Sequence, residues 1–340
     1  MEALHGAVLA AGEGTRLAPL TRYCPKPLVP LAGRPLLAAA LDALRAAGVD
    51  RIGINAFHLG GQVAAAFADD PAITVVTEAT LQGTGGGVRG IAAALPQGPL
   101  VVINGDALFD FPLAPLIARH RAAGALGTLV LREVPPDAPF GRVGIDPTGR
   151  LHRIAEVEGP DAASFPLQFG AFTGVQIIEP ALIAALPPGP GDILRTAWKA
   201  LLARRRPLQG VFVEPWRGWF DVGTPDRYLA AHRAILAGDL AAPHLPPADA
   251  LGRRLHPDAR VHPDARLEGP CAVLAGARIG PAARVGAFSF VDTGARVDGA
   301  LEDAVVWPGV HVPGALAHAI ALPGEIVQLP AATRRAPPAS

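Results

Sequence analysis

The segment LAAGEGTRLAPLTRYCPKPLVPLAGRPLL, residues 9–37, contains the residues best suited to bind an anion. Gly12 and Gly14 let backbone N–H groups approach a negative charge closely. Arg16 adds a planar guanidinium that suits phosphate oxygens. Lys26, one of only two lysines in the chain, is a compact cation between two stiffening prolines. The glycines alone would also suit a tight strand-to-helix turn, but together these residues predict a site for a phosphorylated ligand.

Other nucleotide and catalytic motifs do not fit this sequence. GEGTRL nearly matches the dinucleotide fingerprint, but Leu17 stands where the third glycine belongs, and no Gly-Lys-Ser/Thr follows to make a P-loop. The histidines and cysteines lack zinc-site spacing, and there is no Gly-x-Ser-x-Gly nucleophile elbow.

A second glycine cluster lies in ATLQGTGGGVRG, at residues 83–87, where a helix is expected to begin. The start of a helix favours anions, and glycines let a flat base lie on the backbone. A plain helix N-cap with a flexible approach would produce the same pattern.

Two aspartates each follow an apolar, strand-like run, Asp106 after LVVIN and Asp221 after WF. Either residue could simply cap a helix. Because strand ends can meet over one cleft, we expect the two carboxylates to lie about 4–6 Å apart, close enough to share a cation.

The elements that must position these residues alternate between strands and helices. GAVLAA, RIGINA, AITVVTE and PLVVING are strand-like, and helix-like segments lie between them. This order predicts an α/β fold with a Rossmann-like mixed, mostly parallel sheet and helices on both faces. Ligands bind such sheets at the carboxyl ends of the strands, where residues 9–37 and Asp106 are expected.

After residue 253 the periodicity changes to six. Aliphatic residues recur every six positions, and seven of them are preceded, two positions earlier, by a small residue. This period predicts a left-handed parallel β-helix, in which the aliphatic side chains fill a prism and the small ones fit its corners. The aliphatic residues are Leu255, Val261, Leu267, Val273, Ile279, Val285, Val291 and Val297, and the small ones are Ala259, Ala265, Cys271, Ala277, Ala283, Ser289 and Ala295.

Four parts are therefore expected along the chain: an α/β domain (1–238), a linker rich in proline and alanine (239–252), the β-helix (253–323) and a C-terminal tail (324–340). The open coil ends of a β-helix need covering, so we expect homo-oligomers that form through it.

Charge and composition exclude several classes of partner. The net charge is zero at pH 7, so no global field attracts nucleic acid or an anionic membrane. No apolar run is long enough for a membrane span, and the N-terminus lacks the pattern of a signal peptide. Cys24 and Cys271 lie far apart in the sequence, which favours free thiols and a reducing cytoplasm.

The opening segment resembles the signature of the sugar-1-phosphate nucleotidylyltransferases, the NDP-sugar pyrophosphorylases. The similarity includes Gly-x-Gly-Thr-Arg, Pro-Leu-Thr and Pro-Lys-Pro, and continues through TGGG, NGD and WFDVGTP. A hexapeptide β-helix after this domain is familiar in the family, notably among mannose-1-phosphate guanylyltransferases. The resemblance implies an enzyme that makes an NDP-sugar and pyrophosphate from an NTP and a sugar 1-phosphate.

The resemblance also implies roles for particular residues. Catalysis would fall to Arg16, Lys26 and Asp106. Asp106 and Asp221 would bind Mg²⁺. The nucleotide would be bound by Ala10, Gly12, Gly14, Thr15, Glu78, Gly83, Thr84 and Gly85, and the sugar phosphate by Asn104, Gly144, Glu158 and Thr173.

The substrate pair stays open at this point. Gly159 replaces the lysine that relatives use to hold the sugar phosphate, and Arg142 could substitute for it. GTP with mannose 1-phosphate is the first expectation. UTP with an amino-sugar or heptose 1-phosphate is the alternative, because residues 55–62 and the TGGG run are similar to those of N-acetylmuramate-1-phosphate uridylyltransferases.

Two other functional classes compete with a nucleotidylyltransferase. One is a non-catalytic subunit that senses an NDP-sugar. The glycine at position 159, in place of a lysine, favours this class, and four intact residues argue against it: Arg16, Lys26, Asp106 and Asp221. The other is an acyltransferase that uses the β-helix, but the repeat supports only a few coils.

Overall fold

Two short apolar runs form neighbouring strands at the centre of a sheet. β1 (His5–Leu9) pairs in parallel with β4 (Ile52–Ala56) on one side and with β6 (Leu100–Asn104) on the other. Alternate residues of β6 enter different cores, with Leu100 in one and Val101 in the other. Both faces of the sheet are therefore buried, which explains why these strands are apolar throughout.

The computed structural model describes residues 3–134, 141–213 and 218–330. The chain divides into two compact units, each built from several segments. The first contains residues 1–13, 24–28 and 36–219, and the second contains residues 14–23, 29–35 and 220–340.

The first unit contains a ten-stranded mixed sheet with the order β11-β10-β9-β12-β6-β1-β4-β5, in which β8 pairs with β12 and β13 pairs with β8. β6, β1, β4 and β5 are parallel, and β12 is antiparallel to β6, β8 and β9. The remaining strands of this sheet are β5 (Ile73–Thr77), β8 (Gly127–Arg132), β9 (Arg142–Ile145), β10 (Leu151–Ile154), β11 (Val157–Glu158), β12 (Gln168–Ile178) and β13 (Leu208–Phe212), and β7 (Ala107–Phe109) lies outside it.

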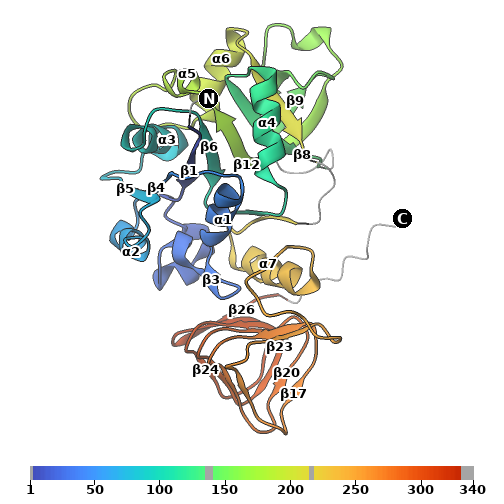
Figure 1. Cartoon of the computed structure of the whole chain (residues 1–340). Coiled ribbons are helices and arrows are strands. Elements are labelled where there is room, and N and C mark those ends of the chain that lie inside the picture. Colours follow the sequence, from blue (N-terminus) through green and yellow to red (C-terminus); the bar gives the residue numbers. More distant parts are fainter. Residues whose placement is uncertain (1–2, 135–140, 214–217, 331–340) are drawn as a thin grey trace. The chain divides into compact units, whose positions relative to one another are not determined.

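Helices cover both faces of this sheet, as the sequence predicted (Figure 1). One core is formed against α1 (Ala38–Ala46), α2 (Gly60–Ala66) and α4 (Leu113–Ala123). The other is formed against α3 (Gly83–Ala94), α5 (Pro180–Ile183), the π-helix η5 (Leu194–Trp198) and α6 (Lys199–Ala203). Two 3₁₀ helices, η3 (Lys26–Leu28) and η4 (Ala162–Ser164), complete the unit. The Rossmann-like mixed sheet is thus confirmed.

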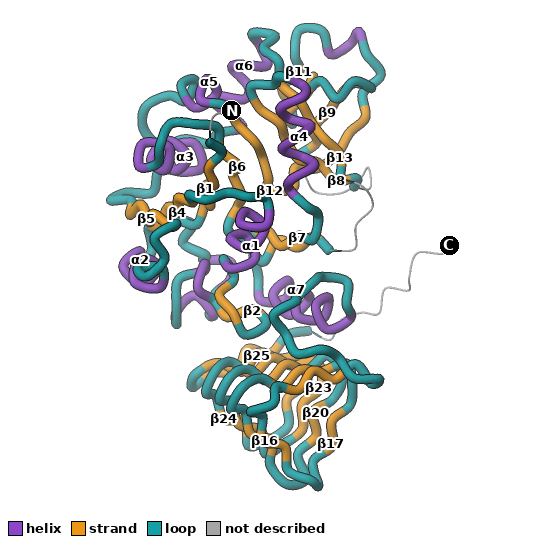
Figure 2. The backbone as a smooth tube through the Cα atoms, viewed as in Figure 1, coloured by secondary structure: helices purple, strands orange, loops and turns teal. Residues whose placement is uncertain are grey.

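The second unit contains the parallel β-helix that the six-residue period predicted (Figure 2). Arg253 pairs with Cys271 and Arg278 with Arg296, so each coil is 18 residues long and consists of three hexapeptides. From Val273 to Val297 the repeated aliphatic residues are almost fully buried. Leu255 is 36% exposed, because the first coil has no coil beneath it.

The repeat fades after residue 297 because the coils become shorter. Arg284 pairs with Ala300, and Leu301 pairs with Leu316, so the spacing falls to 16 and then to 15 residues. The strands of the β-helix are β15 (Arg253–Leu255), β16 (Arg260–Val261), β17 (Arg266–Leu267), β18 (Cys271–Val273), β19 (Arg278–Ile279), β20 (Arg284–Val285), β21 (Phe290–Val291), β22 (Arg296–Val297), β23 (Ala300–Val306), β24 (His311–Val312), β25 (Leu316–Leu322) and β26 (Glu325–Gln328).

Within the segment expected to be a tail, β26 pairs with β25 in antiparallel fashion. The rest of that segment, from residue 331, lies outside the described residues. Residues 239–252, the expected linker, are all described and form neither helix nor strand.

Residues 9–37 are called the signature segment below. Several of its short elements belong to the same unit as the β-helix. They are η1 (Thr15–Leu17), η2 (Leu20–Arg22), β2 (Pro30–Leu31) and β3 (Arg34–Pro35). β14 (Trp219–Asp221) leads into α7 (Pro225–Ala237), which begins at an N-cap threonine, Thr224, and ends at Gly238 with φ +82°. In the part of the chain that the structure describes, no helix is long and apolar enough to cross a membrane.

Candidate functional site

The carboxyl ends of β1, β4 and β6 enclose a cavity of about 300 Å³ in the first unit. Seven of the predicted site residues line it: Ala10, Gly12, Lys26, Gly83, Thr84, Asn104 and Asp106. These residues come from four segments up to 96 positions apart in the sequence. The structure therefore brings them together at the edge of the sheet where the sequence predicted a ligand site.

Lys26 and Asp106 form the one ion pair among the residues that line this cavity. Lys26 Nζ lies 2.7 Å from Asp106 Oδ2, and the two side chains are 14% and 28% exposed. Lys26 is the first residue of η3, and Asp106 follows β6 after Gly105. A Cβ atom at Gly105 would lie 2.9 Å from the Leu9 carbonyl oxygen, so only glycine lets this turn pass so close to β1. The pair places a largely buried cation and a carboxylate in the lining of the cavity.

Asn55 is a site residue that the sequence analysis missed. It ends β4 and is buried, with 2% of its surface exposed. Its Oδ1 accepts a hydrogen bond from the Ala10 backbone N–H at 2.8 Å, and its Nδ2 donates to Glu78 Oε1 at 2.7 Å. Asn55 thus fixes, relative to β4, the start of the loop that begins at Ala10 and contains Gly12 and Gly14, here called the glycine loop. A polar residue at the end of the otherwise apolar run RIGINA was the signal that could have revealed it.

Glu78 uses both carboxylate oxygens within the protein. Oε1 accepts from Asn55, and Oε2 accepts from the Gln82 backbone N–H at 2.8 Å, next to the start of α3. Glu78 does not belong to the set of residues that line the cavity. A carboxylate can accept further hydrogen bonds, so its contact with a base stays a prediction.

The glycines at residues 83–87 allow close packing around the start of α3. The Gly85 backbone N–H donates to the Gly191 carbonyl oxygen at 2.8 Å. A Cβ atom at Gly83 would lie 2.6 Å from that same oxygen, and one at Gly87 would lie 2.4 Å from Asn55 Nδ2. Thr84 Oγ1 accepts from the Ile193 backbone N–H at 2.9 Å. The cluster is therefore explained in part by packing, and its contact with a nucleotide stays a prediction.

The four residues predicted to bind the sugar phosphate lie in different settings. Asn104 ends β6 and lines the cavity. Thr173 is fully buried, and its hydroxyl donates to the Val130 carbonyl oxygen at 3.0 Å. Gly144 on β9 packs under Phe169, whose ring would lie 2.9 Å from an added Cβ atom. Glu158 on β11 is exposed and pairs with Arg153 at 3.0 Å. Only Asn104 of these four reaches the described cavity.

In the second unit, three predicted residues form the turn that leads into η1. Gly14 adopts the left-handed conformation with φ +67°, which favours glycine, and its carbonyl oxygen accepts from Thr21 Oγ1 at 3.1 Å. Thr15 and Arg16 follow within η1, and both are exposed. The exposed guanidinium of Arg16 is free of any ion pair with the described residues. It is therefore available to an anionic ligand.

Asp221 presents one oxygen that has no partner. Its Oδ2 accepts from Arg227 Nη1 on α7 at 2.6 Å. Its Oδ1 is buried and finds no hydrogen-bond partner among the described residues. A Cβ atom at Gly223 would lie 3.0 Å from this Oδ1 and 3.4 Å from Arg16 Nη2, so Asp221 and Arg16 flank the same glycine. A buried carboxylate oxygen without a partner is costly, and a cation would satisfy it.

Comparison with known proteins identifies the family of most of this chain. A family model described as nucleotidyl transferase matches residues 5–238. The chain belongs to the nucleotidyl transferase family.

Named relatives of this nucleotidyl transferase act on different substrates. A mannose-1-phosphate guanylyltransferase of Mycobacterium tuberculosis is 32% identical over 88% of this chain and 79% of its own length. A UTP–glucose-1-phosphate uridylyltransferase of Synechocystis is 28% identical over 72% of this chain. The chain spans 66% of the length of that cyanobacterial relative.

A solved structure has the same fold. It is the crystal structure of a protein from Bacillus anthracis provisionally named a glucose-1-phosphate thymidylyltransferase, with a TM-score of 0.59 and 23% identity. The match covers 71% of this chain and 97% of the other.

Gly159 has a structural reason for being small in this nucleotidyl transferase. Its backbone N–H donates to the His152 carbonyl oxygen at 2.7 Å. An added Cβ atom would lie 3.2 Å from that oxygen and 3.2 Å from Leu202 Cδ1 on α6. A lysine at this position would have to displace its neighbours. Arg142, the suggested substitute, is exposed and lies 4.7 Å from the centre of the Phe169 ring.

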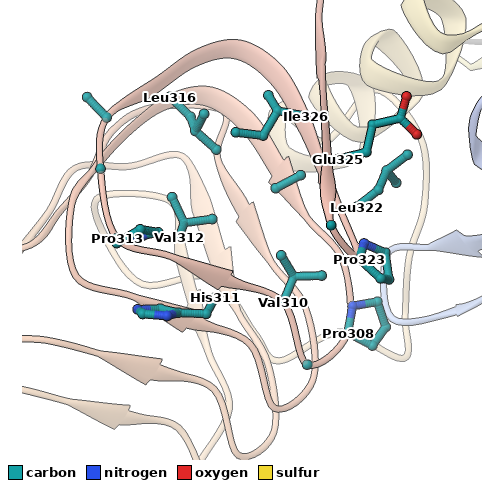
Figure 3. Close-up of a pocket in the computed structure, with 15 residues that line it drawn as sticks. Pro308, Val310, His311, Val312, Pro313, Leu316, Leu322, Pro323, Glu325 and Ile326 are labelled. Carbon is teal, nitrogen blue, oxygen red and sulfur yellow. The ribbon is translucent and has the colours of Figure 1, made fainter.

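A larger hollow of about 690 Å³ lies at the last coil of the β-helix (Figure 3). It is mostly apolar and is lined by residues such as Val310, Val312 and Leu322. His311 and Glu325 are its only ionisable lining residues, so it lacks the groups that nucleotidyl transfer requires.

Proposed function

We propose that this protein transfers a nucleotidyl group from an NTP to a sugar 1-phosphate and releases pyrophosphate. The observation that carries the proposal is the pairing of Lys26 with Asp106 at a cavity lined by the glycine loop of a nucleotidyl transferase. In the reaction an oxygen of the sugar phosphate forms a bond to the α-phosphorus. The bond from that phosphorus to the bridging oxygen breaks, and pyrophosphate takes the electron pair.

Lys26 and Arg16 supply the positive charge that such a reaction requires. Charge accumulates on the leaving pyrophosphate, and preorganised cations stabilise it in the transition state. Asp106 holds the Lys26 ammonium in the lining of the cavity, so little reorganisation is needed when the phosphates bind. Arg16 has an exposed guanidinium that suits the outer phosphates. The remaining contribution of the protein is to hold the two substrates in line.

Asp106 and Asp221 are the residues that would hold Mg²⁺. Two hard carboxylate ligands, with phosphate oxygens and water completing the shell, match the preference of this ion. The buried and unpartnered Oδ1 of Asp221 fits a metal ligand. When bound, Mg²⁺ would neutralise phosphate charge. The spacing of about 4–6 Å that we expect between the two carboxylates stays a prediction.

GTP and mannose 1-phosphate are the substrate pair that we propose first. A mannose-1-phosphate guanylyltransferase is the relative that matches 88% of this chain, including part of the β-helix region. The uridylyltransferase relative supports the alternative pair, UTP with another sugar 1-phosphate.

A panel assay tests both the reaction and the substrate pair. The purified protein with Mg²⁺ is incubated with each of four NTPs and with mannose, glucose, N-acetylglucosamine and heptose 1-phosphates, and pyrophosphate release is measured. We expect the highest kcat/KM with GTP and mannose 1-phosphate. A preference for UTP would select the alternative substrates. No pyrophosphate from any pair, together with binding of an NDP-sugar, would support the non-catalytic sensor instead.

A further inference from the structure

The last coil of the β-helix contacts the signature segment at Tyr23. Tyr23 directly follows η2, seven residues after Arg16. Its hydroxyl donates to Glu325 Oε2 at 3.2 Å, and its ring meets the Trp307 ring edge-on, with centroids 6.1 Å apart. Arg22 Nη1 lies 3.8 Å from the other oxygen of Glu325. The end of the turn that carries Gly14 and Arg16 is therefore held by the β-helix.

Trp307 links this contact to a second part of the signature. Its ring is almost fully buried, and its Nε1 donates to Tyr228 Oη at 3.0 Å. The Tyr228 hydroxyl in turn donates to the Pro30 carbonyl oxygen at 2.6 Å. Residues 14–23 and 29–35, which flank Lys26 on both sides in the sequence, are thus tied to one tryptophan of the β-helix.

The hairpin formed by β2 and β3 is held at its turn as well. Ala32 has the uncommon φ of +50°, and its backbone N–H donates to His232 Nε2 at 3.2 Å. His244 Nε2 lies 2.8 Å from the Ala32 carbonyl oxygen. Gly33 faces Leu274 of the β-helix, because an added Cβ atom would lie 2.4 Å from Leu274 Cδ1. Both polar groups of Ala32 are satisfied, which offsets the strain at this position.

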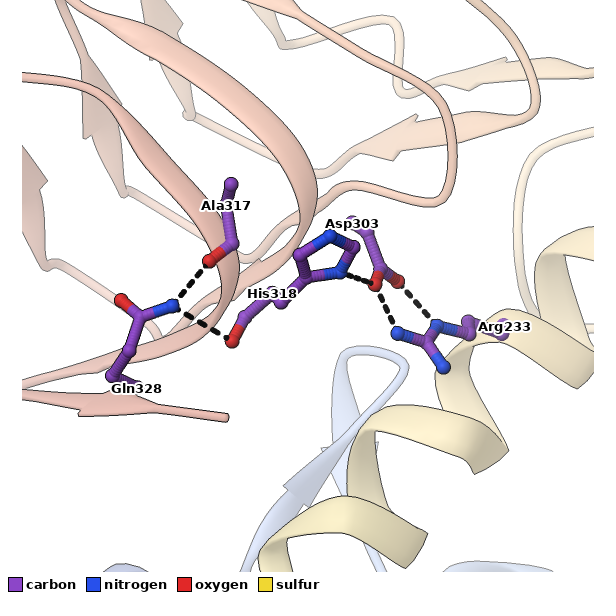
Figure 4. A network of polar contacts seen from close by, with 5 residues as sticks. All are labelled: Arg233, Asp303, Ala317, His318 and Gln328. Atoms are coloured by element: carbon purple, nitrogen blue, oxygen red, sulfur yellow. Dashed lines mark hydrogen bonds and ion pairs between the residues drawn. The ribbon is translucent and has the colours of Figure 1, made fainter. Parts of the chain in front are cut away.

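α7, which carries Tyr228 and His232, is itself anchored to the β-helix (Figure 4). Nε and Nη2 of Arg233 donate hydrogen bonds to the two carboxylate oxygens of Asp303. His318 Nδ1 lies 2.6 Å from Asp303 Oδ2. The Asp303 side chain is only 8% exposed, so this pair is shielded from water and resists screening by salt.

We propose that Tyr23, Trp307 and Glu325 are positioning residues for the phosphate-binding turn of the nucleotidyl transfer reaction. This inference rests on the proposed function. The three residues touch no substrate in it. They act by limiting the motion of η1 and η2, so that Arg16 is held ready for the NTP and less ordering entropy is lost on binding. The β-helix would then serve catalysis directly, in addition to any role in assembly.

The test uses full-length Trp307→Phe and Glu325→Gln. The first keeps a ring and loses the indole N–H, and the second keeps the side-chain shape and loses its charge. Glu268→Gln is the matched control, because Glu268 is another β-helix glutamate whose carboxylate pairs with Arg284. Hydrogen–deuterium exchange is measured on peptides that cover residues 14–23, and KM is measured separately for the NTP and for the sugar 1-phosphate.

We expect faster exchange in residues 14–23 and a raised KM for the NTP in both test variants. The KM should rise about three- to tenfold in Trp307→Phe, the range that losing one hydrogen bond produces. It should rise about two- to fivefold in Glu325→Gln, which loses the charge of Glu325 and keeps an oxygen that accepts from Tyr23. The KM for the sugar phosphate should stay within about twofold of wild type in both test variants. In Glu268→Gln, both KM values and the exchange rates of residues 14–23 should also stay within about twofold.

Unchanged exchange in both variants would overturn the proposal, and so would faster exchange with an unchanged KM for the NTP. If Glu325→Gln is too unstable to purify, Tyr23→Phe removes the hydrogen bond to Glu325 from the other side. If Trp307→Phe is too unstable, Tyr228→Phe removes the acceptor of the indole N–H. A wild-type protein without transferase activity would count against the proposed function, and the exchange data would still decide whether the β-helix restrains this turn.

Discussion

The ammonium of Lys26 lies 2.7 Å from a carboxylate oxygen of Asp106, although the two residues are 80 positions apart. The pair sits in the cavity formed at the ends of the parallel strands. The proposed function assigns this cation to the phosphates of the substrates, and the first prediction concerns its removal.

Lys26→Ala should reduce kcat by at least about 100-fold, because it removes a charge that acts in the transition state. Stability should fall by only about 1 kcal/mol, the size of a partly exposed ion pair. The chain offers a matched control in its other lysine, Lys199, which pairs with Glu156 on the surface. Steady-state kinetics and thermal unfolding of Lys26→Ala and Lys199→Ala check this prediction. Near-wild-type turnover in Lys26→Ala would show that the glycine loop does not serve a triphosphate.

Asp221→Asn and Asp106→Asn should each abolish Mg²⁺-dependent turnover while the fold is kept. An amide is a much poorer ligand for a hard cation than a carboxylate. Mn²⁺ binding, followed by electron paramagnetic resonance, measures the site without relying on activity. Asp226→Asn is the control, since Asp226 is an exposed residue on α7 five positions away. Undiminished Mn²⁺ affinity in both test variants would remove these aspartates from the metal site.

Gly87→Ala should destabilise the protein by about 1–3 kcal/mol, the usual cost of overpacking. The new Cβ atom would lie 2.4 Å from Asn55 Nδ2 and would push Asn55 away from Ala10 and Glu78. Turnover should fall as well, because Asn55 holds the start of the glycine loop.

Gly61→Ala serves as the matched control for this substitution. Gly61 lies in α2 with open space around the new methyl group, so alanine there should be neutral or stabilising by about 0.5–1 kcal/mol. Urea unfolding curves of both variants provide the comparison. Equal stability of Gly87→Ala and wild type would mean that the packing around Asn55 is looser than described.

Acidification should weaken the unit that contains the β-helix through His232. Burial lowers the pKa of this imidazole from 6.5 to about 4. Its Nδ1 donates to the Tyr228 carbonyl oxygen, and its Nε2 accepts from Ala32, so protonation would break the second contact. Below pH 6.5 the unfolded chain binds a proton that the folded chain excludes. The contribution of the neutral His232 side chain to the free energy of unfolding is therefore fully present above pH 6.5. It decreases as the pH falls toward 4, and about 2 kcal/mol is lost at pH 5.

His232→Gln should remove this part of the pH dependence. The free energy of unfolding of wild type and variant is compared at pH 7 and pH 5, with His256→Gln, a partly exposed histidine of the β-helix, as control. The difference in the free energy of unfolding between wild type and His232→Gln should be smaller at pH 5 than at pH 7. If the free energy of unfolding decreased equally in wild type and His232→Gln between pH 7 and pH 5, the assigned role of His232 would be contradicted.

Local patterns in the sequence predicted the main architecture. The period of six identified the β-helix because each inward position recurs at the same corner of the prism, from Val273 to Val297. The shorter coils beyond it could not be foreseen, because a coil of 15 or 16 residues breaks the period while preserving the parallel pairing.

The candidate site was predicted less completely. Lys26, Asp106 and the glycine loop stood out by residue type and spacing. Asn55 was missed because a single polar residue at a strand end has no periodicity. The contact of Tyr23 with Glu325 joins residues 302 positions apart, and no local pattern reports a pairing of that kind. The glycines at 83–87 were predicted for a ligand, and the structure shows that packing against Asn55 and Gly191 also requires them.

The stoichiometry of one reaction tests nucleotidyl transfer most directly. Phosphorus NMR follows the wild-type protein with Mg²⁺, GTP and mannose 1-phosphate, and with the best pair from the substrate panel. We predict that an NDP-sugar and pyrophosphate appear in a one-to-one ratio as both substrates disappear, and that Lys26→Ala forms both at least about 100-fold more slowly. Formation of NDP and orthophosphate without an NDP-sugar, or no reaction with any pair, would contradict the proposed function.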